Sequence, residues 1–293
     1  MGTTFRIVLY TENRNTAQEV FRDAFKRVDT LNQTLSDYLP ESELSRLSQT
    51  AGTGRKIRVS DELFTVLQTA NTISEATDGA FDVTVGPYAR LWKIARAKRE
   101  LPPPARIRRF RNAVGYLHIE IDPKDHAIHL IRPDMFLDLG GIAKGYAADQ
   151  VLQTLAGHGI RSALVDAGGD IVLGDAPPGK EGWSIAIGGR KHPNLPILLL
   201  KNCAVATSGD IEQSIEIEGT RYSHIVDPRT GTGLTNQTQA TLIAPTGMEA
   251  DALASAACIL SHCKIKSLLK ARVNTQAYIL QKQGGQTNLT AIP

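Results

Sequence analysis

The sequence contains little cysteine and little excess charge. Its three cysteines, Cys203, Cys258 and Cys263, are too few and too irregularly spaced for a disulfide framework or a C-x-x-C metal site. The net charge of +3 is small for 293 residues, which argues against a nucleic-acid-binding surface. Hydrophobic residues make up 42% and charged residues 22%, as in ordinary globular proteins. We therefore expect a folded protein that needs no disulfide or zinc and binds no nucleic acid.

Long apolar runs and the common nucleotide motifs are also missing. No apolar run is long enough for a transmembrane segment, and the chain opens at Met1-Gly2-Thr3-Thr4-Phe5 without a charged leader and apolar core. The sequence as written is thus expected to carry no export signal. It has no G-x-G-x-x-G after a strand, no G-x-x-x-x-G-K-[ST] and no H-E-x-x-H, so the Rossmann, P-loop and zincin signatures are absent.

Basic residues gather in one stretch, from Lys93 to Arg111, around the run Pro102-Pro103-Pro104. A solvated loop that leads into a basic helix is one interpretation, and a polyanion site is the other. No aromatic side chains alternate with these charges, which favours the solvated loop and helix.

The apolar periodicity predicts a mixture of strands and helices. Strands are expected at 5–10, 163–165, 183–187, 197–200 and 239–244, with a hairpin at 116–121 and 127–131. Helices are expected at 17–35, 41–47, 60–79, 142–155 and 246–260, with Tyr38 on a loop. The last helix would begin with a capping box of Thr246 and Glu249. Hairpins without sustained strand–helix alternation indicate an α+β fold, with mixed sheets and helices packed on them. No clean linker or repeat is visible, so we expect one domain over residues 1–293.

Small, polar, glycine-flanked clusters stand at the ends of the predicted elements, where functional sites are commonly built. They are Gly79–Asp82, Asp138–Gly145, Ala206–Asp210 and Ser223–Gly231.

Asp251 and Ser255 are one candidate pair. They lie four residues apart on a predicted helix, and hence on one face, where a carboxylate and a hydroxyl can both bind a hard cation such as Mg²⁺. Asp251 could instead only complement the positive N-terminus of its helix, and the spacing alone favours that role.

Asp138 and the glycine pair after it form a second candidate. The amides of this turn and the Lys144 ammonium could face a phosphate, while a carbonyl of Gly140 or Gly141 could face a metal. The same pattern fits a plain tight turn with Asp138 as a helix cap, and the sequence does not separate the two.

His224 is the third candidate, because it stands where a predicted strand ends in a turn. A histidine there could take a proton from a hydroxyl nucleophile near neutral pH. A lone histidine is more often structural, but His224 is flanked by a compact polar motif, unlike His118, His126 or His129.

Taken in order, these clusters resemble the motifs of the flavin transferase family, the FAD:protein FMN transferases also called ApbE. The matching segments run along nearly the whole chain and are 1–4, 36–38, 42–47, 78–87, 138–145, 166–170, 206–210, 224–231 and 250–253. The resemblance implies a T-fold-like α+β architecture. It also implies Mg²⁺-dependent transfer of FMN from FAD to a threonine or serine hydroxyl of a target protein, with release of AMP.

The resemblance further implies roles for particular residues. The FAD pocket would be lined by Met1, Tyr38, Ala80, Phe81, Asp82, Asp138, Lys144 and Ile225. Mg²⁺ would be held by the Gly141 carbonyl, Asp251, the Ala254 carbonyl and Ser255, where many relatives have threonine. His224 would be the base that deprotonates the acceptor hydroxyl.

The partners implied are FAD and an acceptor protein with a D-x-x-[ST]-G-[AS]-[ST]-like motif, a subunit of a redox complex. Asp227–Gly233 partly matches that motif, so self-flavinylation at Thr230 is a disfavoured hypothesis. The family is typically periplasmic or membrane-anchored. This chain begins inside the first family motif, which leaves a cytoplasmic location as the alternative.

Two other functions use the same pocket. Water could replace the acceptor hydroxyl, which would give a Mg²⁺-dependent FAD pyrophosphatase that yields FMN and AMP. The chain could also bind flavin without turnover, although pure binding needs neither a metal nor a base.

Overall fold

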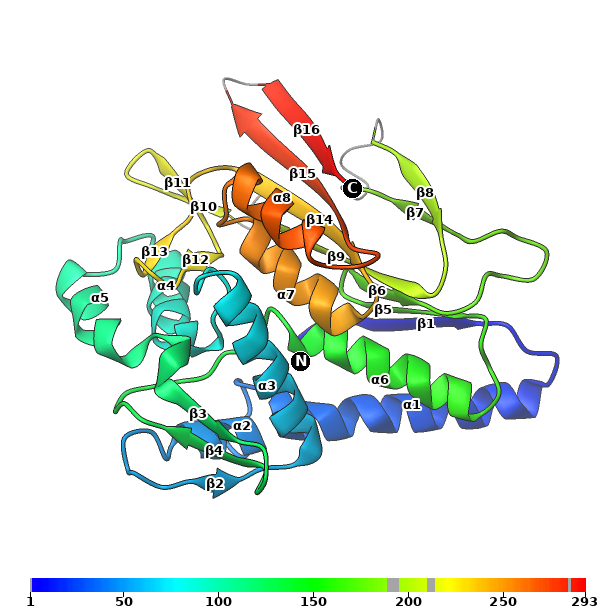
Figure 1. Ribbon diagram of the computed structural model, residues 1–293, viewed down its shortest axis with the longest axis horizontal. Helices are drawn as coiled ribbons and strands as arrows, with labels where there is room; N and C mark the ends of the chain where they lie inside the picture. The colour runs from blue at the N-terminus through cyan, green and yellow to red at the C-terminus, as the bar shows by residue number, and fades with distance from the viewer. Residues whose placement is uncertain (1, 189–194, 210–213, 284–285) are drawn as a thin grey trace.

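A seven-stranded antiparallel sheet forms the centre of the structure, with the strand order β1-β5-β6-β9-β14-β15-β16 (Figure 1). The computed structural model describes residues 2–188, 195–209, 214–283 and 286–293. The strands are β1 (Phe5–Leu9), β5 (Ala163–Ala167), β6 (Asp170–Leu173), β9 (Cys203–Gly209), β14 (Thr238–Ala244), β15 (Gln276–Gln283) and β16 (Gln286–Ile292). Met1 and Asp210 lie outside the described residues.

Both faces of the sheet are covered, and β14 is buried along its whole length for this reason. Alternate side chains of a strand point to opposite faces. Ala240 and Leu242 accordingly join the main hydrophobic core, while Ile243 joins a second cluster with Trp183 and Ile185. That second cluster lies under a hairpin of β7 (Trp183–Ala186) and β8 (Ile197–Leu200).

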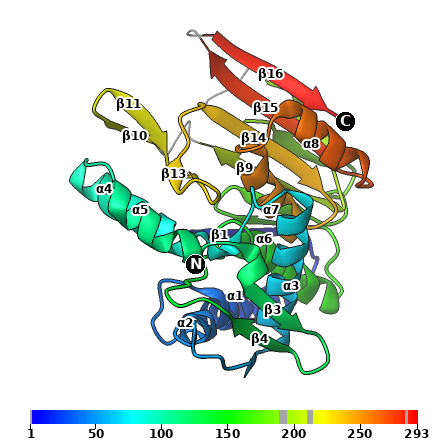
Figure 2. The ribbon, with the colours of Figure 1, turned by 60° about the vertical axis from the view of Figure 1, so that its left-hand side comes forward.

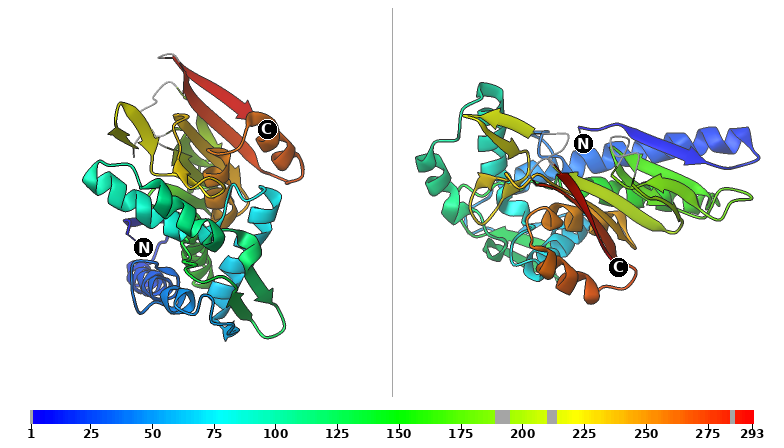
Figure 3. Two further views of the ribbon diagram at one scale, coloured as in Figure 1. Left: turned by 90° about the vertical axis from the view of Figure 1, so that its left-hand side faces the viewer. Right: turned by 90° about the horizontal axis from the view of Figure 1, so that it is seen from above.

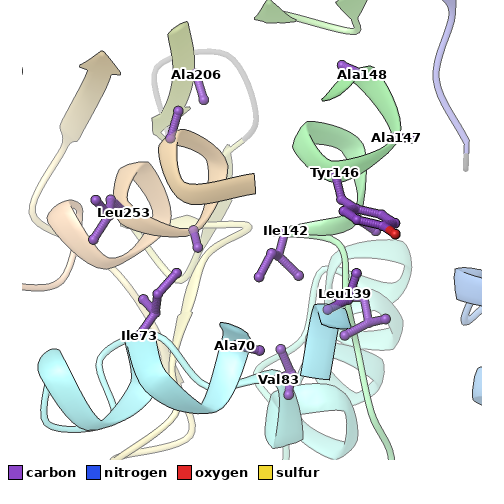
Figure 4. Packing of buried hydrophobic residues seen from close by; sticks show 14 of the residues in the cluster. Ala70, Ile73, Val83, Leu139, Ile142, Tyr146, Ala147, Ala148, Ala206 and Leu253 are labelled. Atoms are coloured by element: carbon purple, nitrogen blue, oxygen red, sulfur yellow. The ribbon is translucent and has the colours of Figure 1, made fainter. Parts of the chain in front are cut away.

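Helices cover the main-core face. These are α6 (Ala143–Gly157) and α7 (Gly247–Ala257) against the sheet, α1 (Arg14–Leu35) packed on α6, and α3 (Asp61–Ala76) beside α7 (Figures 2 and 3). Figure 4 shows side chains from three of these segments around one centre: Ile73 of α3, Leu253 of α7, and Ile142, which directly precedes α6. All three are almost fully buried. The apolar faces of these helices therefore fix where α6 and α7 begin.

Smaller elements surround this core. They are α2 (Glu43–Ser48), α4 (Gly86–Lys98), α5 (Pro104–Phe110) and α8 (His262–Lys270), and the 3₁₀ turns η1 (Val83–Val85), η2 (Arg111–Ala113) and η3 (Tyr116–His118). A small sheet holds β2 (Ile57–Arg58), β4 (Ala127–Leu130) and β3 (Ile119–Asp122), in that order. Two short pairs are β10 (Ser214–Ile217) with β11 (Thr220–Ser223), and β12 (Val226–Asp227) with β13 (Thr232–Gly233). None of the helices in the described ranges is both long and apolar enough for a membrane span.

Most predicted elements are present. Ser60 caps α3 by accepting the N–H of Leu63, and Ser42 caps α2 by accepting the N–H of Ser45. All three cysteines are free thiols, as expected. The α+β fold class with mixed sheets and packed helices is confirmed, while the single-domain organisation stays a prediction.

Three predictions of local structure were wrong. The hairpin starts at Ile119, because Gly115 has a φ of 148° and Tyr116 to His118 then form a 3₁₀ turn. The predicted helix over 246–260 ends at Ala257, and Ser261 caps a separate helix, α8. The basic stretch is more helical than expected, because α4 continues to Lys98 before α5 begins. Its basic side chains are mostly exposed, in keeping with the solvated interpretation.

Candidate active site

The first turns of α6 and α7 touch each other through their backbones. A Cβ atom added at Gly145 would lie 2.0 Å from the carbonyl oxygen of Gly247, and one added at Gly247 would lie 2.5 Å from that of Gly145. Only glycine allows two helices to approach this closely. The crossing brings Lys144, which precedes Gly145, next to Asp251, one turn into α7.

Asp149 of α6 fixes this crossing electrostatically. Its carboxylate accepts the N–H groups of Gly247 (2.7 Å) and Met248 (3.0 Å), two of the unpaired amides at the start of α7. Burial raises the pKa of Asp149 to about 6, against the effect of these two hydrogen bonds. Thr246 accepts the N–H of Glu249 as predicted (3.2 Å), but the Glu249 carboxylate binds Arg272 (3.1 Å). Only the Thr246 half of the predicted capping box is therefore observed, and Asp149 satisfies two further amides of the first turn.

We expect Gly145→Ala to lower the free energy of unfolding by about 1–3 kcal/mol, because its Cβ would force α6 and α7 apart. Gly157→Ala is the matched control, because Gly157 ends the same helix and a Cβ there meets no atom within 4 Å. The control should be neutral or stabilising by up to about 1 kcal/mol. Thermal unfolding followed by circular dichroism measures both, and equal midpoints would show that the close approach is not required.

A buried charge cluster lies beside the crossing. The Lys144 ammonium is 3.1 Å from each carboxylate oxygen of Asp251 and also contacts the carboxylate of Asp170. The side chains of Asp170 and Asp251 are only 5% and 2% exposed, whereas that of Lys144 is 30% exposed. The N–H of Gly145 donates to the second oxygen of Asp251 (3.2 Å). The two carboxylates are thus fixed inside the protein, and the lysine reaches them from the more open side.

These charges shift one another's ionisation. Burial alone would lower the pKa of Lys144, but the charges of Asp251 and Asp170 raise it above its ordinary value. Burial, together with the charge of Asp251, raises the pKa of Asp170. The ammonium therefore stays charged at neutral pH and carries the positive charge of the cluster.

The four predicted metal ligands come from two segments that meet. A Cβ at Gly141 would lie 2.9 Å from the Ser255 hydroxyl oxygen, so the Gly141 backbone and Ser255 face each other directly. Ala254 is in the last turn of α7, and its carbonyl accepts the thiol of Cys258 (3.4 Å). Asp251 lies one turn earlier on the same helix.

The donor set of these residues suits a hard cation. Carboxylate, hydroxyl and carbonyl oxygens are the ligands that Mg²⁺ prefers. Within the described ranges, no three or more His, Cys, Asp or Glu side chains are grouped to hold a metal. The only candidate set we identify in that part of the chain therefore combines Asp251 with hydroxyl and backbone oxygens.

The turn at Asp138 connects this cluster to the segment at residues 80–83. The N–H of Asp138 donates to the carbonyl of Val83 (2.8 Å), and the Phe81 ring would be 3.4 Å from a Cβ at Gly141. The Asp138 carboxylate accepts the N–H of Gly140 (2.8 Å), so it closes the tight turn instead of capping α6. Burial raises the pKa of Asp138. The two glycine-flanked clusters that the sequence singled out thus lie side by side.

Ala80, Phe81 and Asp82 are all buried. The Asp82 carboxylate accepts the N–H and hydroxyl of Thr84 (2.8 and 2.7 Å) and the N–H of Tyr116 (2.7 Å). Asp82 therefore holds the 82–84 turn against η3, a structural role. Its contact with FAD stays a prediction.

Tyr38 offers an exposed aromatic ring near Asp138. Its side chain is 65% exposed, and the Lys93 ammonium lies 4.7 Å from the ring centroid. Burial, and then the charge of Asp138, raises the pKa of the neighbouring Asp37 to about 6, while Arg90 and Lys93 oppose this shift. A ring of this kind, bordered by cations, can stack on a flavin or adenine.

His224 and Ile225 lie between β11 and β12. The carbonyl of Ile225 accepts the N–H of Leu234 (3.0 Å). The side chains of Ile225 and Leu234 pack against the main core. Asn236, two residues on, donates to the carbonyl of Cys258 at the end of α7 (2.8 Å). The segment of His224 is thus tied to the end of α7 that carries Ser255. The role of His224 as a base stays a prediction.

Three polar residues of the site were not assigned from the sequence. Asp170 and Ser208 belong to glycine-flanked clusters that were recognised as motifs, and Ser208 lies 3.2 Å from the Ser255 hydroxyl. Their position beside glycines at strand ends was the available signal. Asp149 could have been found as a charged residue one turn after Gly145 on a mostly buried helix.

Comparison with known proteins gives a consistent result over nearly the full length. A model of the family described as "ApbE family" matches residues 1–279. The FAD:protein FMN transferase of Treponema pallidum is 31% identical over 291 residues, which cover 92% of this chain and 79% of that protein. The FAD:protein FMN transferase of Haemophilus influenzae is 31% identical over 279 residues, covering 90% and 80%. The solved structure of the flavin transferase ApbE from Vibrio cholerae matches with a TM-score of 0.87 and 28% identity, over 99% of this chain and 94% of that one.

Proposed function

We infer, from the premise that this chain belongs to the ApbE family, that it transfers FMN from FAD to a hydroxyl group of a target protein and that Mg²⁺ assists this transfer. The expected resemblance to flavin transferases is confirmed by the family match and by relatives that carry this activity in their names. The single observation that carries the Mg²⁺ assignment is that the Gly141 backbone faces the Ser255 hydroxyl, while Asp251, one turn earlier on the same helix, is buried.

Mg²⁺ would be held by Asp251, the Ser255 hydroxyl and the carbonyls of Gly141 and Ala254. The oxygen character of these groups and the burial of Asp251 support this assignment. When bound, the metal neutralises charge on the diphosphate of FAD, which would otherwise repel an incoming nucleophile.

The chain's own cation would orient the same diphosphate. Lys144 is positively charged and partly exposed, and it lies in the first turn of α6, where the helix dipole favours a bound anion. The exposed ring of Tyr38 would stack on one of the two ring systems of FAD. Phe81 and Ile225 would supply apolar walls, because both already pack against the main core.

His224 would start the transfer by taking the proton from the acceptor threonine. The threonine oxygen then bonds to the FMN-side phosphorus, and the bond from that phosphorus to the bridging oxygen breaks. AMP leaves with that oxygen. Proton transfer by a positioned histidine contributes about 10²–10⁴-fold to the rate of such reactions.

The acceptor is proposed to carry the D-x-x-[ST]-G-[AS]-[ST]-like motif and to be a subunit of a redox complex. Self-transfer is disfavoured, because Thr230 lies on the β12–β13 turn. There its N–H donates to the carbonyl of Asp227 (3.2 Å), and the side chain of Asp227 binds Arg229 (2.7 Å). The periplasmic or membrane-anchored location also stays a proposal.

Intact mass and AMP release test this function together. The protein is incubated with FAD, MgCl₂ and a synthetic peptide that carries the acceptor motif, and a second peptide has valine in place of the acceptor threonine. We expect the first peptide alone to gain the mass of an FMN group, with one AMP released per modified peptide. EDTA should stop both. Release of AMP without any acceptor would identify water as the nucleophile, and flavin binding with no AMP under any condition would leave only a binding function.

A further inference from the structure

Lys144 holds the carboxylate that the proposed function assigns to the metal. Its ammonium contacts both oxygens of Asp251 at 3.1 Å, so it lies where a cation bound to that carboxylate would lie. We propose that Lys144 occupies the metal position in the FAD-free protein and moves away when FAD binds, so that FAD and the metal bind cooperatively. This inference rests on the proposed function and concerns the order of binding.

The geometry allows the lysine to move and the carboxylates to stay. Asp251 is fixed by the N–H of Gly145 and is almost fully buried, as is Asp170. Lys144 has a flexible four-carbon stem and keeps 30% of its side chain exposed. Of the three charged groups, Lys144 is therefore the one that can leave without opening the α6–α7 crossing.

The charges give the reason for the cooperativity. The ammonium of Lys144 already supplies a positive charge to the two carboxylates of the cluster. A divalent ion added while the lysine stays would place two cations against each other in a buried site, which is unfavourable. The diphosphate of FAD brings negative charge to the same place, so the lysine can turn to the phosphates while the metal takes Asp251.

Manganese binding without FAD is the direct test, because Mn²⁺ can be followed by electron paramagnetic resonance without any reaction. We expect Lys144→Met to bind Mn²⁺ at least tenfold more tightly than the native protein when FAD is absent. FAD should raise the Mn²⁺ affinity of the native protein by at least fivefold, within the usual range of site-to-site coupling, and that of Lys144→Met much less. Lys144→Arg keeps a cation at this place and should not raise the Mn²⁺ affinity of the FAD-free protein.

Thermal unfolding covers the case in which Lys144→Met is poorly folded. Loss of the ammonium leaves two buried like charges, so the variant should melt at a lower temperature than the native protein without metal. Mn²⁺ should then raise its melting temperature more than that of the native protein, because binding to the folded state stabilises it. Equal Mn²⁺ affinities of the FAD-free native and Lys144→Met proteins would overturn the inference. Absence of Mn²⁺ binding in all proteins, even with FAD, would instead overturn the metal site of the proposed function.

Discussion

Asp251→Asn should abolish the release of AMP from FAD, with a loss of about 10³-fold or more. Asparagine keeps the shape and one acceptor oxygen, but it removes the only charged ligand of the proposed metal set. A bound metal contributes several kcal/mol to stabilising charge in the transition state, and each 1.36 kcal/mol is a factor of about ten in rate. AMP is measured by chromatography after incubation with FAD, acceptor peptide and MgCl₂.

Glu249→Gln is the matched control, because Glu249 lies on the same helix but its carboxylate binds Arg272. We expect this variant to keep the native rate within about twofold, because Glu249 is not among the proposed metal ligands and glutamine can still accept a hydrogen bond from Arg272. Circular dichroism should show native folding for both variants, because asparagine keeps an acceptor oxygen for the Gly145 N–H, Lys144 still pairs with Asp170, and Glu249→Gln changes only a partly buried side chain. AMP release by Asp251→Asn above a tenth of the native rate would contradict the metal assignment.

The predictable parts of the fold are those with local signals. The helix after Ser60 has a cap and an apolar face, and the strand predicted at 239–244 falls within β14, whose Leu242 and Ile243 are buried on opposite faces of the sheet. By contrast, α4 was missed because Gly86 and Pro87 look like a break, although proline in the first turn is well suited to start a helix. β16 is a mostly polar, exposed strand at the edge of the sheet, and the two-residue strands β12 and β13 are too short for any period.

The residues of the candidate site could be predicted from local motifs and from resemblance, but their contacts could not be. Lys144 and Asp251 are 107 residues apart, and their contact depends on Gly145 and Gly247 at a crossing of two helices. No local pattern encodes such a crossing. The spacing of Asp251 and Ser255 correctly predicted that both lie on α7, one turn apart. It could not show that Lys144 contacts Asp251 or that Gly141 faces Ser255.

His224→Ala is expected to slow FMN transfer to threonine by about 10²–10⁴-fold, with little change in the affinity for FAD. His224→Gln tests the chemistry more sharply, because glutamine can hydrogen-bond to the acceptor hydroxyl but cannot accept its proton at neutral pH. If His224 is the base, both variants are slow. If it only positions the acceptor, glutamine restores most of the rate.

The affinity for FAD separates this role from a structural one. Ile225 packs against the core beside His224, so a disturbed segment would weaken FAD binding as well as transfer. FAD affinity is measured by flavin fluorescence, and His262→Ala, an exposed histidine at the start of α8, is the control that should leave both quantities unchanged. A native transfer rate in both His224 variants would mean that the acceptor loses its proton to another group. In that case the Mg²⁺ proposed at Asp251, and not the imidazole, would have to activate the hydroxyl.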